Sequence, residues 1–207
     1  MPKTRTIARF IQPMECLSVE KIPEGGAWTY ELKLDGYRVI AVKGSGKLTL
    51  YSRRGTDLTQ RFRYVAEGLA SLPDETVIDG EVVALDEQGK PNFNLLQNNR
   101  SADSHIMLYA FDVLIRRGEN LTRQPLSKRR EVLESTVERQ AHVGISQVSH
   151  QSAKEMLAFV KSQGLEGIVA KRSDSVYESG RRSGSWVKRR INASQEFVFG
   201  GYIAQPP

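Results

Sequence analysis

Two apolar runs that meet at a glycine constrain the fold of this chain more than any other feature. Residues 31–38 read Glu-Leu-Lys-Leu-Asp-Gly-Tyr-Arg, with Trp28 and Tyr30 before them and the apolar stretch 39–42 after them. Apolar runs of this length that are interrupted by glycine are typical of strands joined by a break. We therefore expect a strand that ends near Lys33, a turn at Gly36, and a second strand.

The remaining sequence predicts many strands and a few helices. Gly-Ser-Gly at 44–46 indicates a hairpin between 37–43 and 47–52. Further strands are expected at 76–85, with a break at Asp79-Gly80, and at 105–115, 165–172, 186–191 and 196–203. Helical spacing occurs at 60–72, 127–137 and 153–163, the last with a capping box from Ser152 and Glu155. Residues 1–27 are an irregular lead-in, and the predicted class is α+β, built on antiparallel sheets with interspersed helices.

Charge and cysteine content narrow the classes of function. The chain has 30 Lys and Arg against 24 Asp and Glu, a formal charge of +6. Residues 171–190 contain seven basic and two acidic residues, so most of the excess is local, and a clustered basic segment suits phosphates or DNA. A solvent-exposed basic face explains the cluster equally well. Cys16 is the only cysteine, which excludes an intramolecular disulfide and fits a reducing cytoplasm. We expect neither a signal peptide nor a membrane span.

Lys33 is a candidate nucleophile, because a lysine at a strand end can attack once its amine is deprotonated by cationic neighbours or by burial. The alternative is an ordinary solvated lysine beside a turn. Lys-x-Asp-Gly alone is a weak signal, so further motifs have to support it.

Four later stretches combine strand sequence with charged residues. Ser-Arg-Arg-Gly at 52–55 offers paired guanidinium groups for phosphate or ribose oxygens. Asp-Gly-Glu at 79–81 places a carboxylate at a strand start, and residues 166–171 place Glu166 and Lys171 five positions apart. Residues 186–190 alternate, so Lys188 and Arg190 share a face with Trp186. Each stretch alone is also explained by ordinary charged strand ends and structural ion pairs.

Taken in order, these motifs together with Phe-Asp-Val-Leu at 111–114 resemble the motif series of covalent nucleotidyltransferases, the superfamily of ATP-dependent DNA ligases, RNA ligases and capping enzymes. Within it, residues 28–202 are most similar to the adenylation domain of bacterial ATP-dependent DNA ligases, particularly the end-joining ligase D type. The resemblance implies an ATP-grasp-like nucleotidyltransferase fold, ATP and Mg²⁺ as cofactors, and nicked or broken double-stranded DNA as the substrate.

The resemblance also implies a role for each matching residue. Lys33 would form a lysyl-AMP, Glu31 would meet the adenine amino group, and Phe111 would stack on adenine, although plain core packing of Phe111 is nearly as good an explanation. Arg38 and Arg53 would contact ribose and phosphate or the DNA 5′-phosphate. Glu81 and Glu166 would be metal carboxylates, with Glu81 also near the ribose. Lys171 and Lys188 would hold the α-phosphate, and Arg190 replaces a lysine usual in the family, so its contact stays open.

The expected organisation is an adenylation domain at 1–192 and a terminal strand at 193–207 that leads toward an oligonucleotide-binding domain absent from the chain. That domain, or end-joining proteins, would then be supplied separately, in a bacterial cytoplasm near the nucleoid. One alternative is an RNA ligase or a GTP-dependent capping-type enzyme, which would share the lysine chemistry. Another is a non-catalytic DNA-binding module that kept the basic segment.

Overall fold

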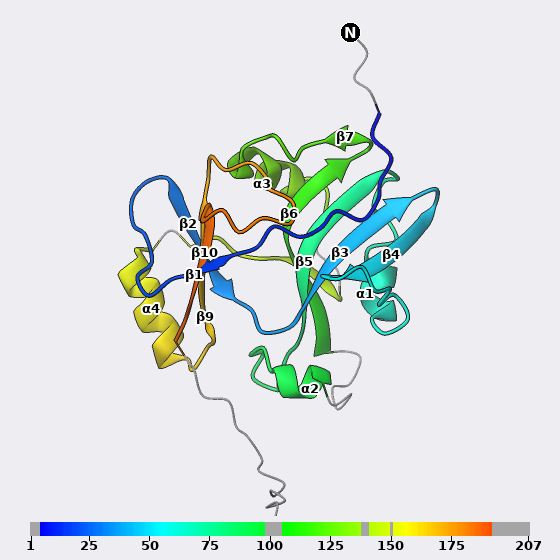
Figure 1. Cartoon of the computed structure of the whole chain (residues 1–207). Coiled ribbons are helices and arrows are strands. Elements are labelled where there is room, and N and C mark those ends of the chain that lie inside the picture. Colours follow the sequence, from blue (N-terminus) through cyan, green and yellow to red (C-terminus); the bar gives the residue numbers. More distant parts are fainter. Residues whose placement is uncertain (1–4, 98–104, 138–140, 150, 192–207) are drawn as a thin grey trace, which may run out of the picture.

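The computed structural model describes residues 5–97, 105–137, 141–149 and 151–191, arranged as two sheets with helices on their outer faces (Figure 1). The smaller sheet has the order β1-β10-β9-β2, and the larger has the order β4-β3-β5-β6-β7, with β8 paired to β6. The elements are β1 (Leu17–Ser18), β2 (Trp28–Lys33), β3 (Tyr37–Gly44), β4 (Lys47–Ser52), α1 (Arg63–Gly68), β5 (Thr76–Ala84), α2 (Phe93–Gln97), β6 (Ile106–Arg116), β7 (Glu119–Asn120), α3 (Leu126–Glu134), β8 (Val143–Ile145), α4 (Ala153–Ser162), β9 (Gly167–Arg172) and β10 (Trp186–Arg190).

The predicted α+β class is confirmed, and most strand pairs are antiparallel. Two pairs are parallel, β1 with β10 and β6 with β8. The hairpin of β3 and β4 turns at Ser45 and Gly46, both at positive φ, and α4 begins with the predicted capping box of Ser152 and Glu155. In the described part of the chain, no helix combines the length and the apolar character needed to cross a membrane.

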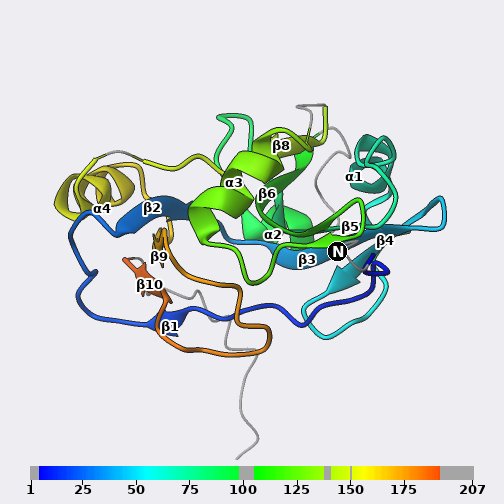
Figure 2. The same cartoon turned by 90° about the horizontal axis from the view of Figure 1, so that it is seen from above.

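Three apolar clusters hold the layers together. One lies between the larger sheet and α1, α2 and α3, and includes Leu69, Leu96 and Leu133. A second covers the opposite face of that sheet, where the N-terminal segment crosses it (Figure 2). This cluster includes Trp186 of β10. The third lies between the smaller sheet and α4 and includes Ile168. The second cluster therefore joins the two sheets, and the candidate site lies beside it.

Several predicted elements differ from the observed ones. The helix expected at 60–72 is the short α1, and the helix expected at 127–137 ends at Glu134 as α3. The break expected at Asp79-Gly80 is wrong, because β5 continues through it with a shift in its register against β6. The sequence did not indicate α2 or β8. The strand expected at 196–203 lies outside the described residues.

Two glycines allow the close approaches that bring the strands to the site. A Cβ atom at Gly36 would lie 2.1 Å from the Val82 carbonyl oxygen of β5. At Gly167, which faces Lys33 across β2 and β9, a Cβ atom would lie 2.1 Å from the Arg189 carbonyl oxygen. Neither distance is possible for a side-chain carbon, so both positions require glycine.

Candidate active site

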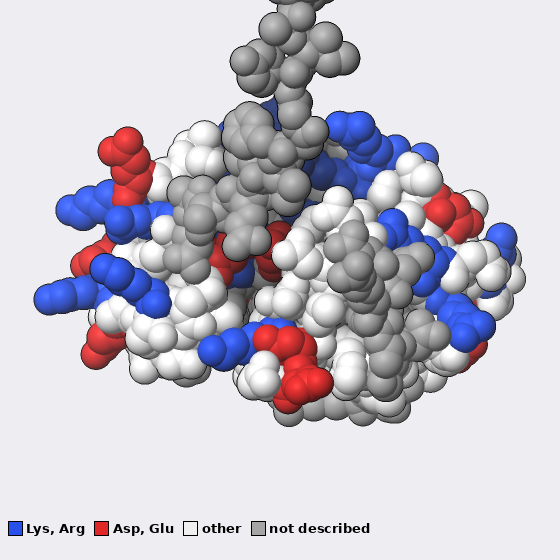
Figure 3. Space-filling view, turned by 90° about the horizontal axis from the view of Figure 1, so that it is seen from below, with Lys and Arg blue, Asp and Glu red and all other residues white. Residues whose placement is uncertain are grey.

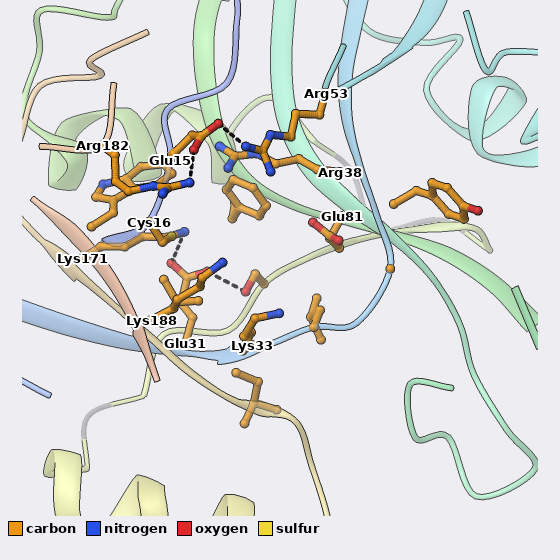
Figure 4. Close-up of a pocket in the computed structure, with 18 of the residues that line it drawn as sticks. Glu15, Cys16, Glu31, Lys33, Arg38, Arg53, Glu81, Lys171, Arg182 and Lys188 are labelled. Atoms are coloured by element: carbon orange, nitrogen blue, oxygen red, sulfur yellow. Dashed lines mark hydrogen bonds and ion pairs between the residues drawn. The ribbon is translucent and has the colours of Figure 1, made fainter. Parts of the chain in front are cut away.

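A cavity of about 920 Å³ lies between the two sheets, within the size range of small-molecule sites (Figure 4). Strands of both sheets line it, together with the N-terminal segment and the chain before β10. Among the residues predicted from sequence, those that line it are Glu31, Lys33, Arg38, Arg53, Glu81, Phe111, Lys171 and Lys188. Glu166 lies next to it through its ion pair with Lys33, and Arg190 in turn pairs with Glu166.

Lys33 is the last residue of β2, as the sequence predicted, and lies directly opposite Gly167. Its Nζ atom is 2.5 Å from Oε2 of Glu166, and Nε of Arg190 is 2.9 Å from the other oxygen of the same carboxylate. Glu166 therefore joins two cations, and Arg190 is one of its ion-pair partners, whereas a contact of Arg190 with a nucleotide stays a prediction. Glu166 also lines a smaller adjoining pocket of about 320 Å³ with Lys33.

Glu31 belongs to a buried ionic cluster. Nζ of Lys171 lies 2.8 Å from its Oε1 atom, and the Ser146 hydroxyl donates to Oε2 at 2.7 Å. Nη1 of Arg130 lies 3.8 Å from Oε1, and Arg130 donates to the carbonyls of Phe111 and Ser146. A carboxylate has about four lone-pair sites, so Glu31 can still accept a hydrogen bond from a ligand.

Lys171 is held between this carboxylate and two aromatic rings. Its Nζ atom lies 4.2 Å from the centre of the Phe111 ring and 4.6 Å from that of Trp186, within the range of cation–π attraction. Phe111 and Trp186 meet edge to face. Phe111 therefore both packs against the core and borders the cavity, so the two explanations weighed for it are compatible.

Arg38 is fixed by Asp79 rather than free in the cavity. Its Nε and Nη2 atoms donate to the two oxygens of Asp79 at 2.9 and 2.7 Å, and the Tyr177 hydroxyl donates to Asp79 at 2.6 Å. Burial opposes the charge of the guanidinium, but the adjacent Asp79 outweighs it and raises the pKa of Arg38. Only the remaining edge of Arg38 is available to a ligand, and Asp79 and Tyr177 are site residues that the sequence did not reveal.

Two pKa shifts report the electrostatics of the cavity. Burial raises the pKa of Glu81 to about 7; Arg38 and Lys33 oppose this shift, whereas Asp79 and Glu166 add to it. Burial also lowers the pKa of Lys188, and the positive charge of Lys33 lowers it further. A cation bound beside Glu81 would therefore stabilise the charged form of this carboxylate, and an anion bound beside Lys188 would stabilise the charged form of this amine.

The basic segment at 171–190 does not form one continuous exposed face. Lys171 is only 3% exposed, and Arg172 pairs with Asp174 at 2.7 Å. Arg182 pairs with Glu15, and Arg190 pairs with Glu166. Instead, some of its basic side chains line the cavity and others lie at its rim, and several of them already pair with carboxylates.

Comparison with known proteins identifies the family. Residues 10–190 match the model of the ATP dependent DNA ligase domain. The chain belongs to the ATP-dependent DNA ligase family. It is 30% identical to the SPbeta prophage-derived DNA ligase-like protein LigB of Bacillus subtilis, over 93% of this chain and 72% of that protein. The resemblance to a ligase adenylation domain, predicted from the sequence motifs, is thereby confirmed.

The ligase D type is represented among its relatives. The chain is 37% identical to the multifunctional non-homologous end joining protein LigD of Pseudomonas aeruginosa over 91% of this chain, yet it spans only 23% of that protein. Among solved structures, a mycobacterial DNA ligase D complexed with ATP and MES superposes with a TM-score of 0.70 and 32% identity, covering 87% of this chain and 60% of that one. The ligase domain of M. tuberculosis LigD gives a TM-score of 0.67 and 33% identity, covering 86% and 58%.

Proposed function

We propose that this ligase adenylation domain transfers AMP from ATP to Lys33 and then to the 5′-phosphate of nicked or broken DNA. The observation that carries the proposal is the position of Lys33, whose amine lies at the cavity wall with Glu166 at 2.5 Å. The amine would attack the α-phosphorus of ATP, so that a nitrogen–phosphorus bond forms and the bond to pyrophosphate breaks. Glu166, within hydrogen-bond distance of the amine, would accept the proton that the amine loses.

The other residues would bind and orient the nucleotide. Lys171 and Lys188 supply positive charge for the α-phosphate, where negative charge increases during attack. Phe111 offers a ring for the base, and Glu31 offers a remaining lone pair for its amino group. Arg53, which is exposed at the rim and pairs with Glu15, would contact a phosphate or ribose oxygen, as would the free edge of Arg38.

Glu81 and Glu166 would hold Mg²⁺. Within the described ranges no group of three or more His, Cys, Asp or Glu side chains is placed to bind a metal. Magnesium commonly uses only one or two carboxylates and completes its shell with water and substrate phosphates, so these two residues fit. When bound, the ion would neutralise phosphate charge, and it would lower the raised pKa of Glu81.

DNA as the substrate is supported by the relatives and by the surface. The relative LigD is named as an end-joining protein, and on the face seen in Figure 3 Lys and Arg side chains lie on both sides of the described surface, with carboxylates among them. We further propose that residues 1–192 form the adenylation domain, that 193–207 lead to an oligonucleotide-binding domain, and that the protein acts in the cytoplasm on chromosomal DNA. Residues 192–207 lie outside the described part of the chain.

The test is the mass of the intact protein after incubation with Mg²⁺ and either ATP or GTP. We expect one added AMP with ATP, none with GTP, and complete loss of the adduct in Lys33→Ala. Lys47→Ala, at an exposed position in the hairpin, is the matched control and should label normally. An adduct that persists in Lys33→Ala would refute the assignment, and guanylylation would favour a capping-type activity.

A further inference from the structure

An acidic side chain from the N-terminal segment lies at the mouth of the cavity. One oxygen of Glu15 accepts a hydrogen bond from Nη2 of Arg53, and the other accepts one from Nη2 of Arg182 (Figure 4). Arg53 directly follows β4, and Arg182 lies between β9 and β10, so the three side chains come from three separate segments. All three line the cavity.

The backbone around Glu15 is fastened to the segment that carries Arg182. The Glu15 amide donates to the Arg181 carbonyl at 2.8 Å, and the Met14 amide donates to the Tyr177 hydroxyl at 3.0 Å. The Ser179 hydroxyl donates to the Gln12 carbonyl at 2.9 Å. The carboxylate is therefore placed by an ordered backbone, and only its own side chain would have to rotate to leave the two arginines.

The arrangement is that of an anion site filled by a side chain. Two guanidinium groups converge on one carboxylate, each through a single Nη2 atom. Among the residues that the structure describes, their other N–H groups have no hydrogen-bond partner and can serve a larger anion. The Arg53 and Arg182 side chains are 58% and 53% exposed, which keeps such pairs weak and exchangeable. A phosphomonoester carries more charge and more acceptor oxygens than a carboxylate, so it can displace Glu15 where a weaker anion cannot.

We propose that Glu15 occupies a phosphate position between Arg53 and Arg182 in the unliganded protein and leaves it when a phosphate group binds. The inference rests on the proposed function, because the phosphate would belong either to ATP or to the 5′ end of a DNA strand. It assigns Arg182 as a second phosphate-binding arginine beside Arg53. It also assigns to Glu15 a role in selectivity: an anion must displace this carboxylate to bind the two arginines, and a strongly charged phosphate does so more readily than a weaker anion.

The test uses Glu15→Gln, which keeps the shape of the side chain and its backbone contacts but removes the charge. Binding is measured by fluorescence anisotropy with a nicked duplex carrying a 5′-phosphate or a 5′-hydroxyl, and by calorimetry with ATP or adenosine. We expect Glu15→Gln to tighten binding of the phosphorylated member of one pair by about two- to tenfold, with little change for its unphosphorylated partner. The pair that responds identifies the source of the phosphate.

Two further variants make the result specific. Arg182→Gln should weaken binding of the same phosphorylated probe and should abolish the gain when combined with Glu15→Gln. Glu131→Gln is the matched control, because it removes the same charge from an exposed ion pair with Lys128 on α3. Its affinities should stay within experimental error of the wild type.

Three results would overturn the proposal. Weaker phosphate binding in Glu15→Gln would show that the carboxylate orients the arginines for the ligand. An equal gain for the unphosphorylated probes or in Glu131→Gln would show a general effect of net charge, and no change with any probe would show that phosphate binds elsewhere. These measurements do not need adenylylation, so absence of the Lys33 adduct would refute the proposed function without deciding this point.

Discussion

Replacing Gly36 by alanine should damage the site more than it damages the fold. The new Cβ atom would lie 2.1 Å from the Val82 carbonyl oxygen and 3.0 Å from a methyl carbon of Val83. Close carbon–oxygen contacts lie at about 3.3 Å, so the backbone around Gly36 has to move by roughly 1 Å. Gly36 lies between Lys33 at the end of β2 and Arg38 in β3, so the movement alters the distance between the two sides of the cavity.

The size of both effects follows from this displacement. A misplacement of roughly 1 Å near reacting groups costs about 100-fold in rate, so adenylylation of Lys33 should fall by about that factor. Overpacking typically costs about 1–3 kcal/mol, which for a chain of this length lowers Tm by about 2–12 °C. Single-turnover labelling with ATP gives the rate, and calorimetry gives Tm.

Gly26→Ala is the matched control. No heavy atom lies within 4 Å of a Cβ atom built at Gly26, and its φ is not in the left-handed region. Its rate and Tm should therefore stay close to those of the wild type. The steric argument fails if Gly36→Ala labels within threefold of the wild-type rate and melts within 2 °C of it, taking roughly 1 kcal/mol as the smallest expected cost.

Three shorter predictions follow from the same structure. Asp112→Ala leaves the fully buried Arg129 without its carboxylate, which should cost about 3–5 kcal/mol and lower Tm by about 6–20 °C; an unchanged Tm would contradict this. The variants Glu81→Ala and Glu166→Ala should each strongly reduce AMP labelling while lowering Tm only modestly, and chelation of Mg²⁺ by EDTA should reduce labelling in the same way. Normal labelling combined with a large loss of Tm would show that both carboxylates are structural. Binding of the 207-residue polypeptide to nicked DNA should be weak and should fall steeply with salt, because few phosphate contacts are available. The polypeptide alone should also seal nicks only slowly. Tight binding at 200 mM salt or rapid multiple-turnover sealing would contradict this.

Local signals in the sequence predicted the local structure well. The glycine turn between β3 and β4 and the capping box of α4 each depend on residues within a few positions of one another. Lys33 was placed correctly at a strand end for the same reason. Asp79-Gly80 was misread because a glycine within an apolar run indicates either a break or a bulge, and only the approach of Leu108 and Tyr109 to Gly80 decides between them.

The contacts within the site were not predictable in this way. Glu31 meets Lys171 140 positions later, and Glu15 meets Arg182 167 positions later. No periodicity links such distant residues, and the lead-in that carries Glu15 has no regular pattern of its own. The residues of the site could be named through their resemblance to a family, whereas Ser146 and Tyr177 carry no motif that separates them from ordinary polar residues. Asp79 belongs to the Asp-Gly-Glu motif, but the motif gave no sign that its carboxylate holds Arg38.

The cavity depends on a contact that neither sheet determines alone. Lys33 ends β2 in the smaller sheet, whereas Arg38 and Glu81 belong to β3 and β5 of the larger one. Their separation is set by the apolar cluster that joins the sheets, in which Trp186 of β10 packs against Tyr177 and Phe111. Tyr177 also donates to Asp79, which holds Arg38. The same aromatic cluster therefore sets both the distance between the sheets and the orientation of Arg38, so a change in its packing alters the geometry of catalysis before it unfolds the chain.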